Sequence, residues 1–297
     1  MKIDFHVHPH FENYSSKALV DAISNNNIDV VGLAGYNEDR FDEYRREIEK
    51  LNSFGFLKVT SDDLAIKAED EYSKDKHYFP RIGEWETEEG FHMLVLGNQQ
   101  NIKQKGKIVE NIEKALESES LVVIDHSFVG HSGKGLFNQY ADISKEQEKI
   151  LYSLCKKYDS KIALEWNGYN IPSFRKSIGF LSRPFGIEFS DINKKLEDFE
   201  IELQKEDINC PIIADSDVHA RSAKDLDLIG KANIEMKDEI IASGKHLQTY
   251  LIKKIFNREY KSNKEYVPGS HFIFSYAIPA IAGSFSEKLK AKIKPRG

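Results

Sequence analysis

The sequence predicts an α/β protein in which a parallel sheet closes into a single barrel-like domain. Three observations lead to this fold class: strand-like and helix-like stretches alternate along the chain, the connections between them are short, and polar residues capable of chemistry follow several predicted strands. Strand–helix repeats with short connections produce parallel strands. An α/β barrel assembles its active site at the carboxyl ends of such strands.

Composition narrows the class of protein further. The chain has 297 residues, of which 40% are hydrophobic and 30% charged, as in ordinary globular proteins. Its formal net charge of -6 argues against a polyanion-binding surface, so we expect no stable nucleic-acid complex. Cys155 and Cys210 lack the spacing of a metal clip or a disulfide framework.

We find no signal peptide ahead of the first strand and no apolar run near the roughly 20 residues of a membrane span, so we expect a cytoplasmic protein without a membrane partner. The oligomeric state has no signature in the sequence.

The opening strand carries the first candidate ligands. Residues 3–8 alternate between apolar and polar side chains, as a strand with two different faces does. His6 and His8 therefore share the polar face with Asp4. Two neighbouring imidazoles backed by a carboxylate form half of a metal site, because each ring offers one nitrogen to a cation while an acceptor holds the other.

The next elements follow from periodicity and capping. A helix is expected over residues 18–23, because apolar residues recur there at helical spacing after potential caps at 15 or 16. The apolar run 28–34 suits a strand buried on both faces. The charged stretch 38–50 is typical of a helix, and residues 56–60 predict a further strand.

The second half of the chain continues the alternation. Residues 81–97 predict a hairpin with a polar turn at 88–90. A helix with Ile108 on its apolar face then leads to a short buried strand at 121–124. The remaining expected elements are a helix opened by a Ser144–Gln147 capping box, a strand at 162–164, a helix capped at 190 or 191, a strand at 211–214 and a helix at 246–256.

Histidines and acidic residues collect at the ends of the predicted strands. In a chain with 10 histidines, these positions are His6, His8, Glu84, His92, His126, His131, Asp217 and His219. A lone histidine at a strand end usually only hydrogen-bonds within the core, but this many together indicate a shared site. Imidazoles mixed with carboxylates suit zinc, manganese or iron, and one carboxylate can bridge two ions.

Four of these motifs resemble those of the PHP (polymerase and histidinol phosphatase) family. They are His6-Val7-His8, Gly83-Glu84, Ile124-Asp125-His126 and Ser216-Asp217-Val218-His219, and the similarity covers about residues 1–230. The resemblance implies a distorted (β/α)7 barrel that binds two or three divalent ions and hydrolyses phosphate esters. We expect this barrel over residues 1–260, with residues 261–297 as a C-terminal extension packed on it or trailing from it.

The resemblance also implies which residues hold the ions. The first ion would be held by His6, His8, Glu84 and Asp217, and the second by Glu84, His92 and His126, with Glu84 bridging the two. Glu86 is a rival to Glu84, because both lie on the same strand face. The family's Asp-His pair after the second strand is missing, since residues 33–37 read Leu-Ala-Gly-Tyr-Asn. We therefore expect two ions of manganese, zinc or iron, and a third ion could be held only weakly, by His10 and His219.

The expected function is hydrolysis of a phosphate ester by a metal-activated water. Asp217, through the ion that it holds, and His219, as general acid for the leaving group, are the predicted catalytic residues. The expected partner is a small phosphorylated substrate. Candidate contacts for its phosphate are His131 and Lys134, in the glycine-rich loop 130–135, and Arg221 after the last motif.

Two other functions stay open at this point. Metal hydrolases of the amidohydrolase or TatD deoxyribonuclease type also open with His-x-His, although they close with a lone Asp where this chain has Asp217-Val218-His219. A non-catalytic or regulatory barrel that has lost turnover would also fit the missing Asp-His pair. Glu165 and Asn167 end a strand on the same rim, where they can shape the pocket or orient a histidine, and neither is assigned to metal.

Overall fold

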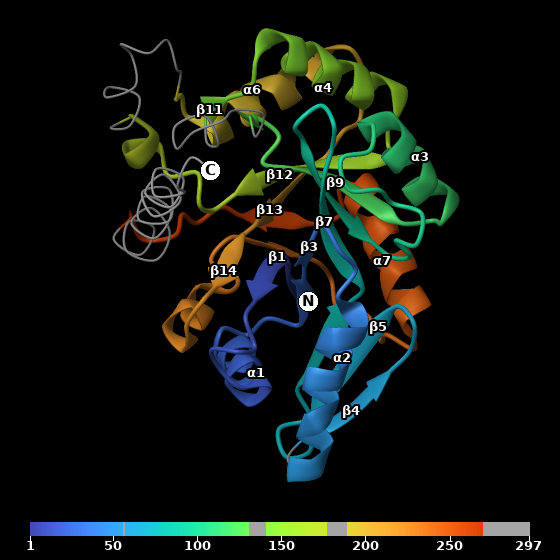
Figure 1. Ribbon diagram of the computed structural model, residues 1–297, viewed down its shortest axis with the longest axis vertical. Coiled ribbons are helices and arrows are strands. Elements are labelled where there is room, and N and C mark those ends of the chain that lie inside the picture. The colour runs from blue at the N-terminus through green and yellow to red at the C-terminus, as the bar shows by residue number, and fades with distance from the viewer. Residues whose placement is uncertain (56, 131–140, 177–188, 270–297) are drawn as a thin grey trace, which may run out of the picture.

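The computed structural model describes residues 1–55, 57–130, 141–176 and 189–269 (Figure 1). The predicted phosphate contacts His131 and Lys134 lie outside the described residues, as do residues 270–297 of the predicted extension. The described helices lie outside the strands (Figure 1). Within the described part of the chain, none of the helices combines the length and the apolar character that a bilayer crossing requires.

The first sheet is centred on the opening strand, β1 (Lys2–Pro9). Its parallel neighbours are β2 (Val30–Leu33) and β14 (Val218–Ala220), and β14 pairs with the carboxyl half of β1 so that His8 aligns with His219. The sheet continues past β2 through β6 (Lys76–Pro80), β5 (Ala65–Asp70) and β4 (Leu57–Ser61), and past β1 through β15 (Asn233–Glu235) and β16 (Lys261–Asn263). β4, β5, β15 and β16 run antiparallel to their neighbours.

The second sheet contains six strands in a mixed arrangement. Their order is β13 (Ile212–Asp215), β12 (Ile162–Asn167), β9 (Leu121–Asp125), β8 (His92–Leu96), β7 (Ile82–Glu86) and β3 (Gly35–Tyr36). β9, β12 and β13 are parallel, whereas β8 is antiparallel to both of its neighbours. A short ribbon of β10 (Val129–Gly130) and β11 (Ala141–Asp142) follows β9.

The predicted α/β class and the predicted hairpin are confirmed, but the sheets are mixed rather than wholly parallel. The antiparallel pairs are the predicted hairpin of β7 and β8, which needs no crossover helix, and the pairs made by β4, β5, β15 and β16. Closure of the two sheets into one (β/α)7 barrel stays a prediction, and so does a domain boundary at residue 260. Residues 261–263 form β16 and so extend the first sheet.

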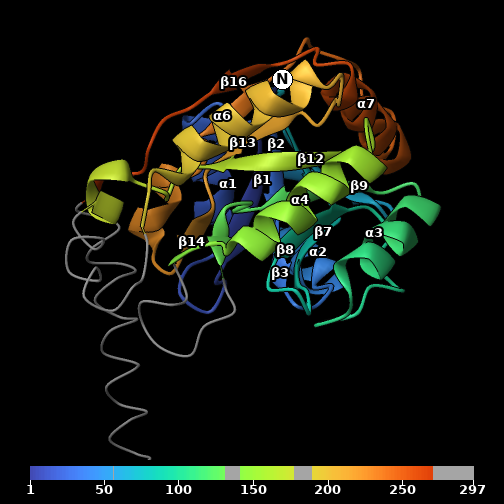
Figure 2. The same ribbon diagram turned by 90° about the horizontal axis from the view of Figure 1, so that it is seen from above.

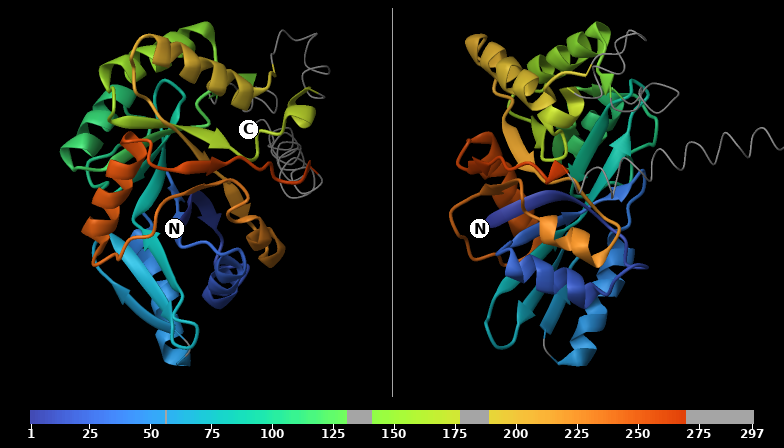
Figure 3. Two further views of the ribbon diagram at one scale, coloured as in Figure 1. Left: turned by 180° about the vertical axis from the view of Figure 1, so that it is seen from behind. Right: turned by 90° about the vertical axis from the view of Figure 1, so that its left-hand side faces the viewer.

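Helices α1 (Ser16–Asn25), α4 (Lys145–Lys157) and α6 (Ile192–Lys205) begin at side-chain caps that the sequence predicts. Ser15 accepts a hydrogen bond from the Ala18 amide, Ser144 and Gln147 form a capping box, and Asp191 caps the helix that follows it. The helices and helical turns whose bounds lie within the described residues are α1 (Ser16–Asn25), α2 (Phe41–Glu49), η1 (Lys50–Phe54), α3 (Ile108–Glu117), α4 (Lys145–Lys157), α6 (Ile192–Lys205), η3 (Ala223–Leu228) and α7 (Gly244–Phe256). Helices α4 and α6 lie next to β12 (Figure 2), and α7 lies against the first sheet at β5 and β6 (Figure 3).

Strand β2 is buried on both faces, as its unbroken apolar sequence predicts. Val30 and Val31 point into two different apolar clusters, and both are fully buried. Between them and Leu33 lies Gly32, where an added Cβ would stand 2.2 Å from the carbonyl oxygen of Phe5. Glycine at this position therefore lets β2 approach β1 closely enough to fix the strand that carries His6 and His8.

Candidate metal centre

Nine imidazole and carboxylate side chains from six strands or strand ends meet at one edge of the two sheets. They are His6 and His8 on β1, Glu84 on β7, His92 on β8, Asp125 and His126 at the end of β9, Glu165 on β12, and Asp217 and His219 around β14. His92 reaches this edge because β8 is antiparallel, so its first residue lies opposite Glu86 and Asp125 at the ends of its neighbours. The arrangement brings together residues that are far apart in the sequence.

One group of possible ligand atoms comes from His6, His8 and Asp217. The Nε2 atoms of His6 and His8 lie 2.9 Å apart, and they are 3.5 and 3.8 Å from Oδ1 of Asp217. Both rings are buried. Two imidazole nitrogens and a carboxylate oxygen that face one another in this way match the ligands of a divalent transition metal.

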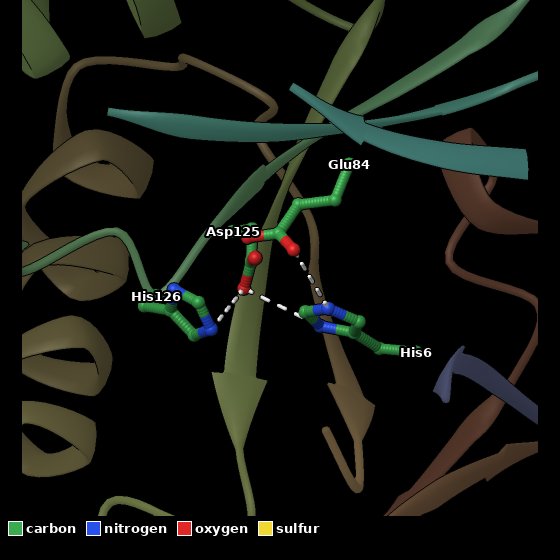
Figure 4. A group of neighbouring side chains, drawn as sticks. All are labelled: His6, Glu84, Asp125 and His126. Carbon is green, nitrogen blue, oxygen red and sulfur yellow. Dashed lines mark ion pairs between the residues drawn. The ribbon is translucent and has the colours of Figure 1, made fainter. Parts of the chain in front are cut away.

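A second group consists of His6, Glu84, Asp125 and His126, whose ligand atoms all lie within 4.8 Å of one another (Figure 4). Oδ1 of Asp125 is 3.1 Å from Nε2 of His126 and 3.5 Å from Nδ1 of His6. Oε2 of Glu84 is 3.2 Å from Nε2 of His8, while its Oε1 contacts Nδ1 of His92. Glu84 therefore presents one oxygen to the rings of β1 and the other to His92.

The charge balance of this cluster calls for cations. Glu84, Asp125, Glu165 and Asp217 are all buried, and in the described part of the chain their ion-pair partners are histidines. Both carboxylate oxygens of Asp125 and Oδ1 of Asp217 are buried without a hydrogen-bond partner among the described residues. Buried carboxylates of this kind are costly unless they are paired or bind a metal. The residues present therefore fit divalent metal ions, whose charge would balance the buried carboxylates.

The same crowding perturbs the pKa values of the cluster. Burial alone would lower the pKa of His6, but the charges of Asp125, Asp217 and Glu165 outweigh it and raise that pKa well above its usual value. Burial raises the pKa of Asp125, and the Glu165 charge adds to the rise. The pKa of Asp217 is lowered, because His6 and His126 outweigh the effect of burial. Opposite pKa shifts within one buried cluster mark a functional-site candidate.

The backbone is strained at two of the candidate ligands. His126 has φ = 38° and Asp217 has φ = 52°, which is the left-handed region that non-glycine residues adopt at a cost. Each follows the end of a buried strand, β9 or β13. Both side chains contact the cluster, and strained backbone of this kind is common at functional sites.

The turn that carries Asp217 is fixed by a buried carboxylate of the opening strand. Asp4 accepts hydrogen bonds from the amides of Ser216 and Gly230 at 3.1 and 2.7 Å and also bonds the Ser216 hydroxyl. Asp215 in turn accepts a hydrogen bond from the Phe5 amide at 2.8 Å. The first and last ligand motifs are thus tied together through the residues that precede His6 and Asp217.

Glu165 and Asn167 form a hydrogen-bonded layer behind the candidate ligands. Oε1 of Glu165 lies 2.7 Å from Nδ1 of His6, and its Oε2 accepts from the His126 amide at 3.1 Å. Nδ2 of Asn167 donates to Glu165 and to Oδ2 of Asp217, at 3.0 and 2.9 Å. Burial would raise the pKa of Glu165, but His6 and the hydrogen bonds lower it to about 2. The carboxylate is positioned to hold His6 with Nε2 turned toward His8 and Asp217.

We expect Glu165→Gln to weaken metal binding by roughly 10- to 100-fold, because the neutral side chain supports the His6 ring less well. Calorimetric titration of the metal-free protein with Mn²⁺ measures this affinity directly. Glu202→Gln, an exposed glutamate on α6, is the matched control and should leave the affinity unchanged. Equal affinities for Glu165→Gln and the wild type would contradict the positioning role.

The other predicted site residues lie around this cluster. The His219 ring stacks on His8 with centroids 4.5 Å apart, and burial together with the charge of His8 lowers the His219 pKa to about 3. Arg221 is exposed just after β14. Nδ1 of His10 lies 3.0 Å from Glu12, outside both groups of ligand atoms described above. Glu86 pairs with Lys105 at 3.9 Å, so the structure places Glu84 rather than Glu86 among those groups.

Asp125 is the residue that sequence reasoning did not assign to the site. In the sequence it belongs to the Ile124-Asp125-His126 motif without a role of its own, whereas in the structure its carboxylate lies between His6 and His126. The signal that could have found it is its place as the last residue of a buried apolar strand, where parallel strands converge. Glu165 follows the apolar residues 162–164 in a similar way, but it lies within β12, which continues to Asn167.

The chain is therefore a mixed α/β protein with a candidate metal centre at a sheet edge. No family model matches its sequence, and no curated protein does either. Among solved structures it is similar to the lesion-specific endonuclease PfuEndoQ from Pyrococcus furiosus, with a TM-score of 0.46 and 17% identity over 88% of this chain and 57% of that one. It is also similar to Endonuclease Q in complex with a 27-mer duplex that has an abasic lesion at the active site, with a TM-score of 0.40 and 14% identity over 89% of this chain and 58% of that one. The chain thus spans a little over half the length of these proteins, and membership of the PHP family stays a prediction.

One prediction about partners is corrected by this comparison. A small phosphorylated substrate and the absence of a stable nucleic-acid complex were expected, but both similar structures are endonucleases and one of them holds duplex DNA. The net charge of -6 was a poor guide, because it sums over the whole chain. Several of its acidic residues are buried in the candidate metal centre, where bound cations would cancel their charge.

Proposed function

We propose that this protein is a metal-dependent hydrolase of phosphate esters. The observation that supports the proposal most directly is the position of Glu84, with one oxygen facing His6 and His8 and the other facing His92. A carboxylate in this position can be shared by two ions, and two nearby divalent ions form a clamp suited to phosphoryl chemistry. We propose manganese, zinc or iron, because the donors are imidazoles and carboxylates.

The proposed site residues fall into ligands, residues that support the ligands, and substrate contacts. We propose His6, His8, Glu84, His92, Asp125, His126 and Asp217 as the ligands. When bound, a pair of divalent ions supplies an activated water and stabilises the negative charge that develops on phosphorus. Glu165 and Asn167 hold the ligands in place from behind. His219 lies beside Asp217, and because a ring whose pKa is about 3 is neutral at neutral pH, we propose that it donates a hydrogen bond to the leaving oxygen rather than acting as the expected general acid. We propose that exposed Arg221 contacts the phosphate.

Replacing His126 by asparagine tests the proposal. Asparagine tolerates the left-handed backbone at this position better than alanine does, so the variant removes the imidazole without adding strain. We expect about two ions per wild-type chain by elemental analysis, fewer in the variant, and hydrolysis of bis(4-nitrophenyl) phosphate lowered by roughly 100-fold or more.

The matched control is His246→Asn on α7, which should keep both the metal content and the activity. Hydrolysis of amide or lactone substrates but not of phosphate esters by the metal-loaded protein would contradict the proposed reaction and favour an amidohydrolase-type activity. No turnover of any ester above the His126→Asn background would favour a non-catalytic barrel.

A further inference from the structure

Tyr36 exposes a large aromatic surface beside the candidate metal centre. Its side chain is 48% exposed, although it belongs to strand β3. The centroid of its ring is 5.5 Å from that of His92, which contacts Glu84. Exposed apolar surface is unfavourable in water, so an aromatic ring held open at the edge of a reaction centre indicates a ligand that covers it.

The backbone around Tyr36 is held rigidly. Strand β3 pairs with β7 so that Tyr36 aligns with Glu84. The next residue, Asn37, has φ = 57°, donates its amide to the Glu84 carbonyl at 2.7 Å, and accepts from the Glu86 amide at 2.8 Å. At Gly35 an added Cβ would stand 2.6 Å from the carbonyl oxygen of Glu38. The ring is therefore presented on a fixed support rather than on a loose loop.

The phenol adds no charge to this edge. A tyrosine hydroxyl has an ordinary pKa of about 10, so it is protonated near neutral pH. A neutral aromatic ring does not repel a phosphate group. It offers a π-face to a flat ring, and stacking of this kind is how proteins bind nucleic-acid bases without reading their sequence.

We propose that Tyr36 is a substrate-contact residue that stacks on a nucleobase next to the phosphate held at the metal centre. The inference rests on the proposed phosphoesterase function and names its substrate class, a nucleic-acid strand or a nucleotide ester. It also gives a role to the position where the Asp-His pair of the PHP motif is missing. Tyr36 takes up the edge of the site on the side of His92.

Two esters with the same leaving group test this inference with the full-length, manganese-loaded protein. Thymidine 5′-(4-nitrophenyl phosphate) carries a base, whereas methyl 4-nitrophenyl phosphate does not. We expect Tyr36→Ala to lower kcat/KM for the thymidine ester by roughly 10-fold or more, mainly through KM, and to change the methyl ester by no more than about twofold. Tyr36→Phe should retain the wild-type preference, because it keeps the ring.

The control Tyr72→Ala removes an exposed tyrosine from the turn after β5 and should change neither ester. An equal loss on both esters, or no loss on the thymidine ester, would overturn the role of Tyr36. Wild-type protein that hydrolyses neither ester would instead count against the proposed function.

If the wild-type protein hydrolyses neither ester, a binding assay still tests the role of Tyr36. Fluorescence anisotropy in Ca²⁺ compares labelled oligothymidylate with an abasic strand of the same length. We expect Tyr36→Ala to weaken binding of the thymidylate strand alone, and an equal affinity of wild type and variant for that strand would overturn the inference.

Discussion

Asp217→Asn is expected to lower metal-dependent ester hydrolysis by roughly 1000-fold or more. Asp217 directs Oδ1 toward His6 and His8 and Oδ2 toward His126 and Asn167, so the change removes a negative charge from the middle of the centre. Asparagine is close to isosteric and tolerates the backbone at φ = 52°. Steady-state hydrolysis of a phosphodiester in the presence of Mn²⁺, with the metal content measured on the same samples, gives the result.

Asp207→Asn provides a closely matched control for this substitution. Asp207 also has a left-handed backbone, with φ = 58°, but it is exposed after α6 and distant in sequence from every proposed ligand except the last motif. Its substitution should leave hydrolysis and metal content unchanged. Full activity of Asp217→Asn would show that Asp217 is not needed as a metal ligand. Loss of activity in both Asp217→Asn and Asp207→Asn would point to a general effect on folding.

Removal of bound metal is expected to lower the melting temperature by roughly 5 °C or more. An ion present at 100 times its dissociation constant stabilises the folded state by about 2.7 kcal/mol, and a chain of this size gains about 2 °C per kcal/mol. Mutual repulsion of the four buried carboxylates, which the ions would relieve, acts in the same direction. Differential scanning calorimetry with and without a chelator measures the shift.

A chelator preloaded with the same ion is the control for this experiment, since it should cause no shift. The Asp217→Asn variant should show a smaller difference between its metal-loaded and chelated forms than the wild type does. A wild-type melting temperature that is insensitive to chelation would contradict a metal centre built on these residues.

The parts of the fold and site that depend on local sequence could be predicted. Alternation along residues 3–8 places His6 and His8 on one face of β1, and both side chains lie in the candidate centre. The turn at 88–90 gives the β7–β8 hairpin with Glu84 and His92 on one face. Gly83 next to Glu84 has a packing reason, because an added Cβ would stand 2.3 Å from Oε1 of Gln99.

What sequence reasoning missed depends on contacts between distant strands. Strands β5 and β6 were not predicted, since β5 is rich in charged residues and sits near the edge of the first sheet. Asp125 gained no assigned role, because its distance from His6 is set by the packing of the two sheets against each other. His10 was expected near a third ion, but its short-range contact with Glu12 turns one ring nitrogen to that carboxylate.

The hairpin origin of Glu84 and His92 has a consequence for how the protein folds. These two side chains are eight positions apart and meet as soon as β7 and β8 pair, and isolated hairpins form within about 1 to 10 microseconds. His6 and Asp217 are 211 residues apart in the sequence, so they meet only after slow closure of a very long chain loop. Two of the seven proposed ligands are thus assembled early, whereas the pair from the first and last motifs meets at the end, and the uptake of tightly bound ions would report the final step of folding.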